Sequence, residues 1–223
     1  MRTLTRIVLA TSAVAVLHSA LASRPAKSAA ARLVGERNRN AFYRPFFHAQ
    51  SVVTFGGLLL YIGRQPNREI WRVGTIPTIA FNAIRIAALG AMISAVRQIG
   101  LRRLLGVTGV KAWSSGVQEV PAEPEAQGPA LDQARPVSGP FRYTRHPLNF
   151  LGLPLLWLAP RMTRNRLVFN LVASFYLYLG SWHEEHRLRL AYGEKYEEYR
   201  KQAYFLLGHK KLIQSPPPAT TSD

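Results

Sequence analysis

The segment Gly139-Pro-Phe-Arg-Tyr-Thr-Arg-His-Pro-Leu-Asn-Phe-Leu-Gly152 joins a polar, proline-rich part of the chain to a long apolar part. No acidic residue occurs between Asp132 and Glu184, where two adjacent glutamates follow the apolar part. The two arms of a helical hairpin run antiparallel, so the polar ends of such a hairpin lie close together. We therefore predict that the Arg-His-Pro segment meets Glu184 and Glu185, and that together they hold one small zwitterionic ligand with cationic groups.

The composition narrows the classes of protein. The chain has 223 residues, a formal net charge of +17 and no cysteine. The lack of cysteine excludes a disulfide framework, a thiolate metal site and a cysteine nucleophile. A basic chain can bind nucleic acid, but here the cations lie in segments between apolar runs, and no basic-aromatic platform stands out. This pattern predicts segments that face an anionic membrane surface, and no nucleic-acid partner.

Residues 1–112 contain three apolar runs, at 4–22, 46–62 and 76–96, which we predict to be membrane-anchoring helices. Each approaches the roughly 20 residues that a helix needs to cross about 30 Å of hydrocarbon. The alternative for the first run is a secretory signal peptide, because Ala20-Leu-Ala-Ser resembles a small-residue cleavage site. We favour a retained span, since further apolar runs follow it.

Arg85 lies inside the third of these runs. A cation within a span is costly and normally faces the bundle interior or a water-filled cavity. Two interpretations stay open: contact with an anionic ligand or headgroup, and snorkelling or pairing with a backbone carbonyl.

The second half of the chain begins with a predicted flexible linker at 113–138, which is rich in proline, alanine and glutamate. Apolar runs at 148–160 and 167–182 then predict a helical hairpin within residues 139–205. The first arm is only about 20 Å long as a helix, so the hairpin is tilted or partly spanning. Residues 206–223 are predicted to be a disordered tail.

After the hairpin, the sequence predicts a charged amphipathic helix. Spacings of four, four and three residues place one apolar and aromatic set on a single face, namely Leu188, Tyr192, Tyr196 and Tyr199. The predicted fold class is therefore all-α: a polytopic integral membrane protein with about five membrane helices and a C-terminal amphipathic helix in the cytoplasm.

The positive charges predict an orientation. The segments 23–45 and 97–111 are strongly basic and are separated by two spans, so they share one side of the membrane. By the positive-inside rule that side is cytoplasmic. Counting five crossings places 142–147 and 184–200 on the same side and the turn 161–166 on the opposite side. We expect a bacterial inner-membrane protein whose site faces the cytoplasm.

The charged residues also have purely structural interpretations. Glu185 and Arg189 are four residues apart and could pair along the helix, which leaves Glu184 as the glutamate with a role toward a ligand. Arg145-His-Pro could open a helix at its first turn while the arginines anchor lipid headgroups. Both interpretations stay open beside the ligand-binding one.

A known family shares these features. The chain resembles the isoprenylcysteine carboxyl methyltransferase family in the segment Gly139-Pro-Phe-Arg-Tyr-Thr-Arg-His-Pro, in the hairpin, in Glu184-Glu185 and in Tyr192-Gly-Glu-Lys-Tyr-Glu-Glu-Tyr199. That family belongs to a wider membrane group with phospholipid and thiol methyltransferases and NnrU-like bacterial proteins. The resemblance covers residues 139–200 well and the three upstream spans loosely.

The resemblance implies an integral-membrane enzyme that uses S-adenosyl-L-methionine without a Rossmann domain. It implies a cofactor pocket formed by Tyr143, Arg145, His146, Pro147, Asn149, Glu184 and Tyr192. Glu184 corresponds to the binding glutamate of the family, and aromatic and carboxylate groups suit the ammonium and sulfonium of the cofactor. The cofactor carboxylate suits Arg145. For catalysis the candidates are Arg145, His146 and Glu185.

The sequence departs from the family at several positions. Asn149 stands where the family usually has tyrosine or phenylalanine, and Leu151 replaces a glycine, which follows one residue late as Gly152. The usual Arg-Val-Pro near the end is replaced by Lys201-Gln-Ala-Tyr-Phe. Gly180 stands where the prenylcysteine enzymes carry a substrate-binding arginine. The resemblance therefore supports the cofactor more than the prenylcysteine substrate.

The predicted activity is methyl transfer from S-adenosyl-L-methionine to a lipophilic acceptor from the bilayer, or to a small thiol, carboxylate or amine. A thiolate or carboxylate is already nucleophilic, so positioning and exclusion of water would supply most of the catalysis. An amine would need a base, for which His146 and Glu185 are candidates. Two alternatives are a nicotinamide-dependent membrane lipid reductase and a non-enzymatic NnrU-like membrane factor.

Overall fold

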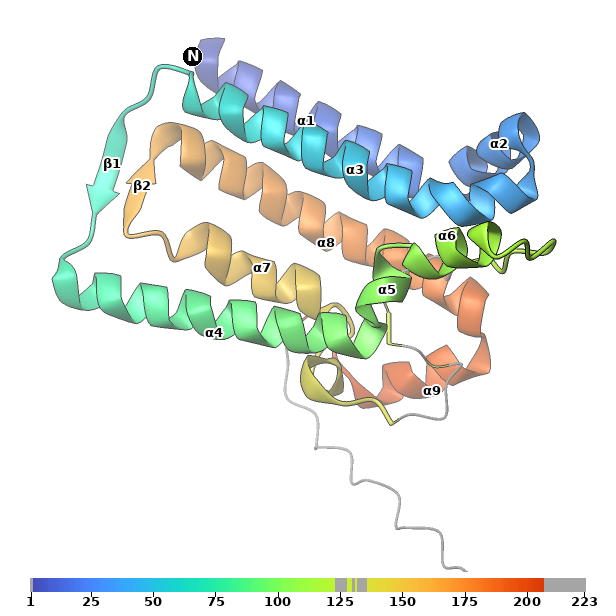
Figure 1. Cartoon of the computed structure of the whole chain (residues 1–223). Helices are drawn as coiled ribbons and strands as arrows, with labels where there is room; N and C mark the ends of the chain where they lie inside the picture. Colours follow the sequence, from blue (N-terminus) through green and yellow to red (C-terminus); the bar gives the residue numbers. More distant parts are fainter. Residues whose placement is uncertain (1, 123–127, 130, 132–135, 207–223) are drawn as a thin grey trace, which may run out of the picture.

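The computed structural model describes residues 2–122, 128–129, 131 and 136–206 (Figure 1). Part of the predicted linker and nearly all of the predicted tail lie outside the described residues. In the described part the elements are α1 (Arg2–Ala22), α2 (Arg24–Val34), α3 (Glu36–Gly63), β1 (Glu69–Arg72), α4 (Thr75–Ile99), α5 (Leu101–Leu104), α6 (Val107–Ser114), η1 (Gly139–Arg142), α7 (Pro147–Trp157), β2 (Arg161–Thr163), α8 (Arg164–Tyr192) and α9 (Glu194–Gln202).

Three of these helices, α1, α3 and α4, are long and apolar enough to cross a membrane, and they contain the three predicted spans. Many of their large apolar side chains point outward; Val16, Val52 and Ile76 are 68%, 73% and 82% exposed. Outward-facing apolar side chains suit contact with lipid. Helix α7 is apolar but has only 11 residues. In the described part of the chain, three of the about five predicted membrane helices therefore meet the length and composition of a span.

The basic segment 23–45, which lies between two predicted spans, is helical. Ser23 caps α2 by accepting a hydrogen bond from the backbone nitrogen of Ala26 at 3.4 Å, and the alanine-rich sequence that follows favours a helix. Gly35, with a φ of 81°, separates α2 from α3 in a backbone conformation that glycine tolerates. The charges at 97–111 likewise lie on the end of α4 and on α5 and α6.

A short antiparallel β-ribbon is the departure from an all-α fold. Strand β1 pairs with β2, with Trp71 opposite Met162 and Arg72 opposite Arg161. Buried Asn165 donates to the backbone oxygens of Gln65 and Pro66 at 3.4 and 3.2 Å, and so anchors the start of α8 to the turn before β1. The ribbon therefore ties the α3–α4 turn to the α7–α8 turn, although both read as polar turns in the sequence.

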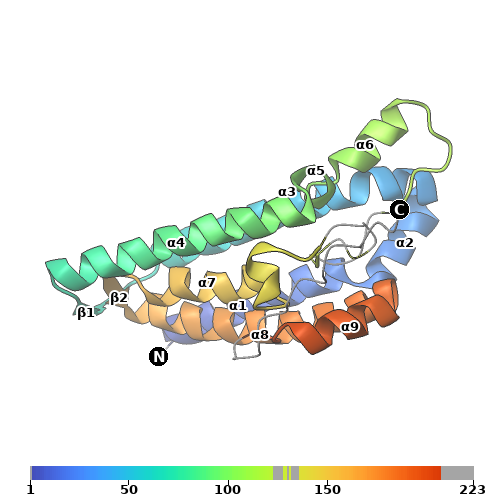
Figure 2. The same ribbon diagram turned by 90° about the horizontal axis from the view of Figure 1, so that it is seen from below.

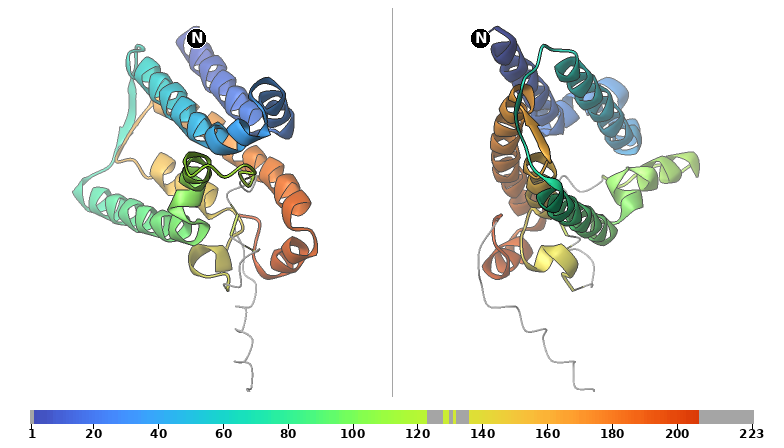
Figure 3. Two further views of the ribbon diagram at one scale, coloured as in Figure 1. Left: turned by 45° about the vertical axis from the view of Figure 1, so that its right-hand side comes forward. Right: turned by 90° about the vertical axis from the view of Figure 1, so that its left-hand side faces the viewer.

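The long helices form one elongated bundle (Figures 1 and 2). Helix α1 packs against α3 and α8, while α7 packs between α4 and α8 (Figure 3). One apolar cluster joins α1 and α3, with Ile7, Leu58 and Ile62 buried and Val168 and Phe169 of α8 packed against them. A second cluster near the far end of α4 and α8 consists of Ala95, Ile99, Phe141, Leu188, Tyr196, Tyr199 and Ala203.

The basic segments and the predicted site gather at one end of this bundle. The β-ribbon and the start of α1 lie at the opposite end (Figure 1). Helices α2, α5, α6 and α9, together with the start of α7, lie at the site end (Figures 1 and 2). The prediction that 142–147 and 184–200 meet at the end of the bundle that also carries 23–45 and 97–111 is therefore confirmed. Which side of the membrane this end faces stays a prediction.

Candidate functional site

His146 lies between the two glutamates at the site end of the hairpin. It precedes Pro147, which occupies the first turn of α7 and is compatible with a helix start there. Its Nδ1 atom is 3.2 Å from Glu184 Oε2, and its Nε2 atom is 3.5 Å from Glu185 Oε1. Successive residues of an α-helix point about 100° apart, so the imidazole contacts both carboxylates from between them. The predicted meeting of the Arg-His-Pro segment with the glutamate pair is therefore observed.

Arg145 binds Glu185 and the end of α9. Its Nε donates to Glu185 Oε1, and its Nη1 donates to the backbone oxygens of Ala203 at 2.7 Å and Arg200 at 3.3 Å. The guanidinium also lies over the ring of Phe205, at 5.7 Å. The Arg145 and Glu185 side chains are 10% and 7% exposed, so this ion pair is largely removed from solvent. Arg145 thus fixes Glu185 in position.

The pairing of Glu185 with Arg189 along the helix, which the sequence left open, is not observed. Arg189 instead pairs with Glu197 at 2.9 Å, while Glu185 also accepts a hydrogen bond from the hydroxyl of Tyr196 at 3.2 Å. The reason is the break at Gly193, whose φ of 54° ends α8 and turns α9 back toward it. One continuous charged helix was predicted, and two shorter helices are observed.

The predicted apolar and aromatic face survives this break. Leu188, Tyr196 and Tyr199 are buried, and Tyr192 packs against the same cluster. The hydroxyl of Tyr199 donates to the backbone oxygen of Phe141 at 2.8 Å, which ties α9 to the segment before His146. These tyrosines therefore hold α9 against the segment that carries Arg145 and His146.

The segment that follows α9 packs against the segment that carries His146. Thr144 and Tyr204 form a parallel bridge, in which the Arg145 backbone nitrogen donates to the Tyr204 oxygen at 2.7 Å. This places the Phe205 ring 5.1 Å from the His146 ring. From the sequence, Phe205 was assigned no role, because it belongs to Lys201-Gln-Ala-Tyr-Phe, the segment that replaces the usual Arg-Val-Pro of the family.

Burial and charge set the ionisation of this cluster. Burial acts to raise the pKa of Glu185, but hydrogen bonds and charge from His146 and Arg145 outweigh it and lower the pKa to about 2. Burial acts to lower the pKa of His146, but hydrogen bonds and charge from both glutamates outweigh it and raise the pKa above its ordinary value. Burial raises the pKa of Tyr196, so its phenol stays protonated and donates to Glu185. The two carboxylates therefore stabilise the protonated form of the imidazole that lies between them.

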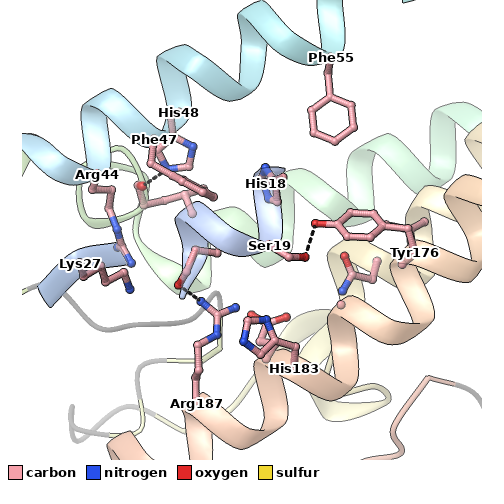
Figure 4. A pocket seen from close by; sticks show the side chains of 16 residues that line it. His18, Ser19, Lys27, Arg44, Phe47, His48, Phe55, Tyr176, His183 and Arg187 are labelled. Carbon is pink, nitrogen blue, oxygen red and sulfur yellow. Dashed lines mark hydrogen bonds between the residues drawn. The ribbon is translucent and has the colours of Figure 1, made fainter. Parts of the chain in front are cut away.

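A cavity of about 260 Å³ adjoins this cluster (Figure 4). It lies between α1, α3 and α8, with contributions from α2, α5 and α7. Its walls are His18, Ser19, Ala22, Lys27, Arg44, Phe47, His48, Phe55, Leu104, Asn149, Tyr176, Leu177, Gly180, His183, Glu184 and Arg187. Among the described residues that line it, Glu184 is the one acidic side chain.

The structure brings some of the predicted site residues together and places others apart from them. Asn149 and Glu184 line the cavity, while Arg145, His146 and Glu185 form the buried cluster behind Glu184. Pro147 is buried at the start of α7, and Tyr192 packs on the apolar cluster. Tyr143 is 60% exposed and lies outside the cavity wall. Their roles toward a ligand stay predictions.

Asn149 has a polar partner that a tyrosine or phenylalanine would not need. Its side-chain nitrogen donates to Ser181 Oγ at 2.8 Å, and Ser181 Oγ donates to the Leu177 backbone oxygen at 2.8 Å. The short amide therefore joins α7 to α8 at the cavity wall. Asn149 and Ser181 form a matched pair.

The amino-terminal helices form much of the cavity, although the sequence predicted only an anchoring role for them. At one end, the His18 ring lies 4.7 Å from Phe47, 5.6 Å from Phe55 and 6.2 Å from Tyr176. At the other end are Lys27, Arg44 and Arg187 (Figure 4). The single signal for this in the sequence was the presence of His18 in an apolar run. The cavity thus has an aromatic end and a cationic end, with Glu184 in its wall.

Comparisons with known proteins give partial matches. A segment of 84 residues is 39% identical to a methanethiol S-methyltransferase of Pseudomonas deceptionensis, and it covers 35% of this chain and 32% of that protein. Segments of 67 residues are 39% and 33% identical to methanethiol S-methyltransferases of Crocosphaera subtropica and Mycobacterium tuberculosis, covering 30% of this chain and 26% and 28% of those proteins. The chain thus spans less than a third of the length of these curated relatives. No family model and no solved structure matches it.

Proposed function

We propose that the protein is a membrane methyltransferase that transfers a methyl group from S-adenosylmethionine to a small thiol. The observation that carries this proposal is Glu184, a carboxylate fixed by His146 in the wall of a cavity that also has aromatic and cationic walls. Similarity to proteins named methanethiol S-methyltransferase supports the reaction and the class of acceptor. We further propose that the site end of the bundle faces the cytoplasm, because the basic segments gather there.

The chemistry of the lining residues fits this cofactor. Carboxylates and aromatic rings recognise cationic groups, and guanidinium groups recognise carboxylates. Glu184 would hold the ammonium group, and the rings around His18 would contact the sulfonium or the base. Arg145, which we expected to meet the cofactor carboxylate, would instead act through Glu185 and His146 as a positioning residue.

When bound, S-adenosylmethionine would supply a methyl group that is attached to a positively charged sulfur. The acceptor thiolate would form a bond to the methyl carbon in line with the bond from that carbon to the donor sulfur, and the electron pair of the broken bond would stay on the donor sulfur. The protein's own part is positioning and exclusion of water. The buried cluster holds Glu184 in one place, and cations in the cavity wall favour a deprotonated acceptor.

The cavity favours a small acceptor over a prenylated one. Its volume of about 260 Å³ has to admit the donor as well as the acceptor, which leaves little space for a prenyl chain. Gly180, which replaces the substrate-binding arginine of the prenylcysteine enzymes, lies in its wall. A lipophilic acceptor from the bilayer is therefore the weaker of the two predicted classes.

The test is a binding and turnover assay on the full chain in lipid nanodiscs. We expect saturable S-adenosylmethionine binding by calorimetry, and formation of dimethyl sulfide from methanethiol by gas chromatography. Glu184→Gln should abolish both, whereas Glu194→Gln, at an exposed position of α9, should retain both. Binding of NADPH in place of S-adenosylmethionine would overturn the proposal in favour of a reductase. Binding of neither cofactor would overturn it in favour of a non-enzymatic factor.

A further inference from the structure

One ring nitrogen of His18 is bound to the protein and the other is not. Its Nδ1 atom lies 3.1 Å from Ser51 Oγ, across the contact between α1 and α3. Among the described residues Nε2 has no hydrogen-bond partner, and the ring lines the cavity. An ionisable side chain within an apolar span costs free energy and is a candidate for function by default. The placement of His18 therefore points to a role for its second nitrogen.

The hydrogen bonds of Ser51 determine which nitrogen of His18 carries the hydrogen. A serine hydroxyl has one hydrogen to donate and two lone pairs that can accept. Ser51 Oγ donates its hydrogen to the backbone oxygen of Phe47 at 2.6 Å, one turn earlier on α3, and it accepts from Gln50 Nε2 at 3.0 Å. The remaining lone pair is left for His18 Nδ1, so Nδ1 is the donor. In the neutral imidazole, Nε2 then carries a free lone pair and can accept a proton.

Aromatic neighbours hold the ring in place. Its centre lies 4.7 Å from Phe47 and 5.6 Å from Phe55 on α3, and 6.2 Å from Tyr176 on α8 (Figure 4). Ser19, the next residue on α1, donates to the Tyr176 hydroxyl at 3.3 Å. Contacts with α3 and α8 therefore restrict the His18 side chain, and a group held in position acts on a bound reactant more effectively than a mobile one.

We propose that His18 is the general base that deprotonates the acceptor thiol. The inference rests on the proposed function, with the sulfonium of the donor beside the rings around His18. Nε2 takes the proton of the acceptor S–H group, and the electron pair of that bond stays on the acceptor sulfur. This sulfur then forms the bond to the methyl carbon, while the pair of the broken carbon–sulfur bond stays on the donor sulfur. The proton leaves Nε2 for water once the products have gone.

A small alkyl thiol gains much from such a group. The thiolate, and not the thiol, is the nucleophile, and with an ordinary pKa of about 8.5 even the cysteine thiol is mostly protonated at neutral pH. A positioned general base typically contributes a factor of about 10²–10⁴ in rate. His48 and His183 also line the cavity, but the Nε2 atom of His48 already bonds to the backbone oxygen of Leu104 at 2.7 Å. His18 is the histidine at the aromatic end, where the methyl group would lie.

The experiment uses the full chain in nanodiscs and two acceptors of similar size, ethanethiol and trifluoroethanethiol. The electron-withdrawing fluorines make the second thiol far more acidic, so much more of it is already thiolate at neutral pH. His18→Asn keeps an amide that can donate to Ser51, but it removes the basic nitrogen. The matched control is His186→Asn, at an exposed position of α8 outside the cavity wall.

At saturating donor, we expect His18→Asn to lower kcat/KM for methanethiol and ethanethiol by about 100-fold or more, and that for trifluoroethanethiol by less than about tenfold. The variant should still bind S-adenosylmethionine by calorimetry, and His186→Asn should match the wild type with every acceptor. No loss, or equal losses for ethanethiol and trifluoroethanethiol, in a variant that binds the donor would overturn the role of His18. The selective loss in His48→Gln or His183→Asn, with His18→Asn fully active, would overturn it in favour of that histidine.

A second measurement observes the ring directly in the wild type. Nitrogen magnetic resonance on histidine-labelled protein distinguishes a protonated from an unprotonated ring nitrogen, and contacts with the Phe47 and Phe55 rings identify the His18 signals. We expect the hydrogen of the neutral ring on Nδ1. A hydrogen on Nε2 would overturn the proposal, whatever the kinetics show. A wild type that has the expected tautomer but binds no donor and methylates no thiol would overturn the proposed function, and the base with it.

Discussion

His146 Nδ1 and Glu184 Oε2 lie 3.2 Å apart, and this contact joins the residue that precedes α7 to the C-terminal third of α8. Both residues are buried, at 3% and 8% exposure. Glu185 contacts the other imidazole nitrogen. The histidine therefore helps to position the Glu184 carboxylate, and it links the start of α7 to the cavity wall.

Replacing the His146 ring should lower the stability of the folded protein. We expect His146→Ala to lower the free energy of unfolding by about 3–5 kcal/mol, because it leaves two buried carboxylates without their shared partner. His186→Ala, at an exposed position of α8, should change it by less than about 0.5 kcal/mol. Denaturant unfolding in detergent micelles, followed by circular dichroism, measures both. Equal losses in the two variants would contradict the role assigned to His146.

The stability that this cluster contributes should fall both at high pH and at low pH. The pKa of His146 is raised above 6.5, so its contribution is full below pH 6.5 and is lost as the pH rises through the folded-state pKa. The pKa of Glu185 is lowered from 4.5 to about 2, so its contribution is full above pH 4.5 and is lost as the pH falls toward 2. We expect the difference in Tm between the wild type and His146→Ala to be largest between pH 4.5 and 6.5. A difference that grows on the alkaline side would contradict an imidazolium at this position.

Arg145 and Glu185 should show a measurable coupling energy. Their side chains are 10% and 7% exposed, so a double-mutant cycle with Arg145→Gln and Glu185→Gln should give about 1–3 kcal/mol. The matched exposed pair is Arg189 and Glu197, each 47% exposed, for which we expect less than about 1 kcal/mol. Chemical unfolding of the four single and two double variants measures both energies. A coupling energy no larger for the buried pair would mean that Arg145 does not fix Glu185.

The sequence predicted the elements that depend on local pattern. The three long spans follow from their predominantly apolar composition, and the approach of His146 to Glu184 follows from a hairpin whose polar ends must meet. The face formed by Leu188, Tyr196 and Tyr199 also survives, because helical spacing fixed it on both sides of Gly193.

Features that depend on tertiary contacts could not be predicted in the same way. Local helical spacing favours Arg189 as the partner of Glu185, whereas the observed choice of Arg145 depends on α9 folding back after Gly193. The cationic end of the cavity combines Lys27 with Arg187, which are 160 positions apart, and each reads as an ordinary membrane-flanking cation. Strand β1 could not be predicted because it has only four residues, all of them exposed, and it forms by pairing with β2.

Gly180 provides a direct test of the cavity. A Cβ atom added at this position meets no other atom within 4 Å, and the residue lies in the cavity wall. Gly180→Ala should therefore fold normally, and it should gain up to about 1 kcal/mol from helix propensity. Gly180→Leu should fold as well, but its side chain would occupy part of the roughly 260 Å³ and weaken donor binding.

The matched control for Gly180→Leu is Gly90→Leu on α4, where an added Cβ also meets nothing within 4 Å but the residue lies outside the cavity wall. Calorimetry with S-adenosylmethionine in nanodiscs compares the two. We expect at least about a tenfold loss of affinity for Gly180→Leu, which corresponds to about 1.4 kcal/mol, and no change for Gly90→Leu. Full affinity in a folded Gly180→Leu variant would show that the donor binds elsewhere, and the search for its site would then move to the outer side of His146 and Phe205.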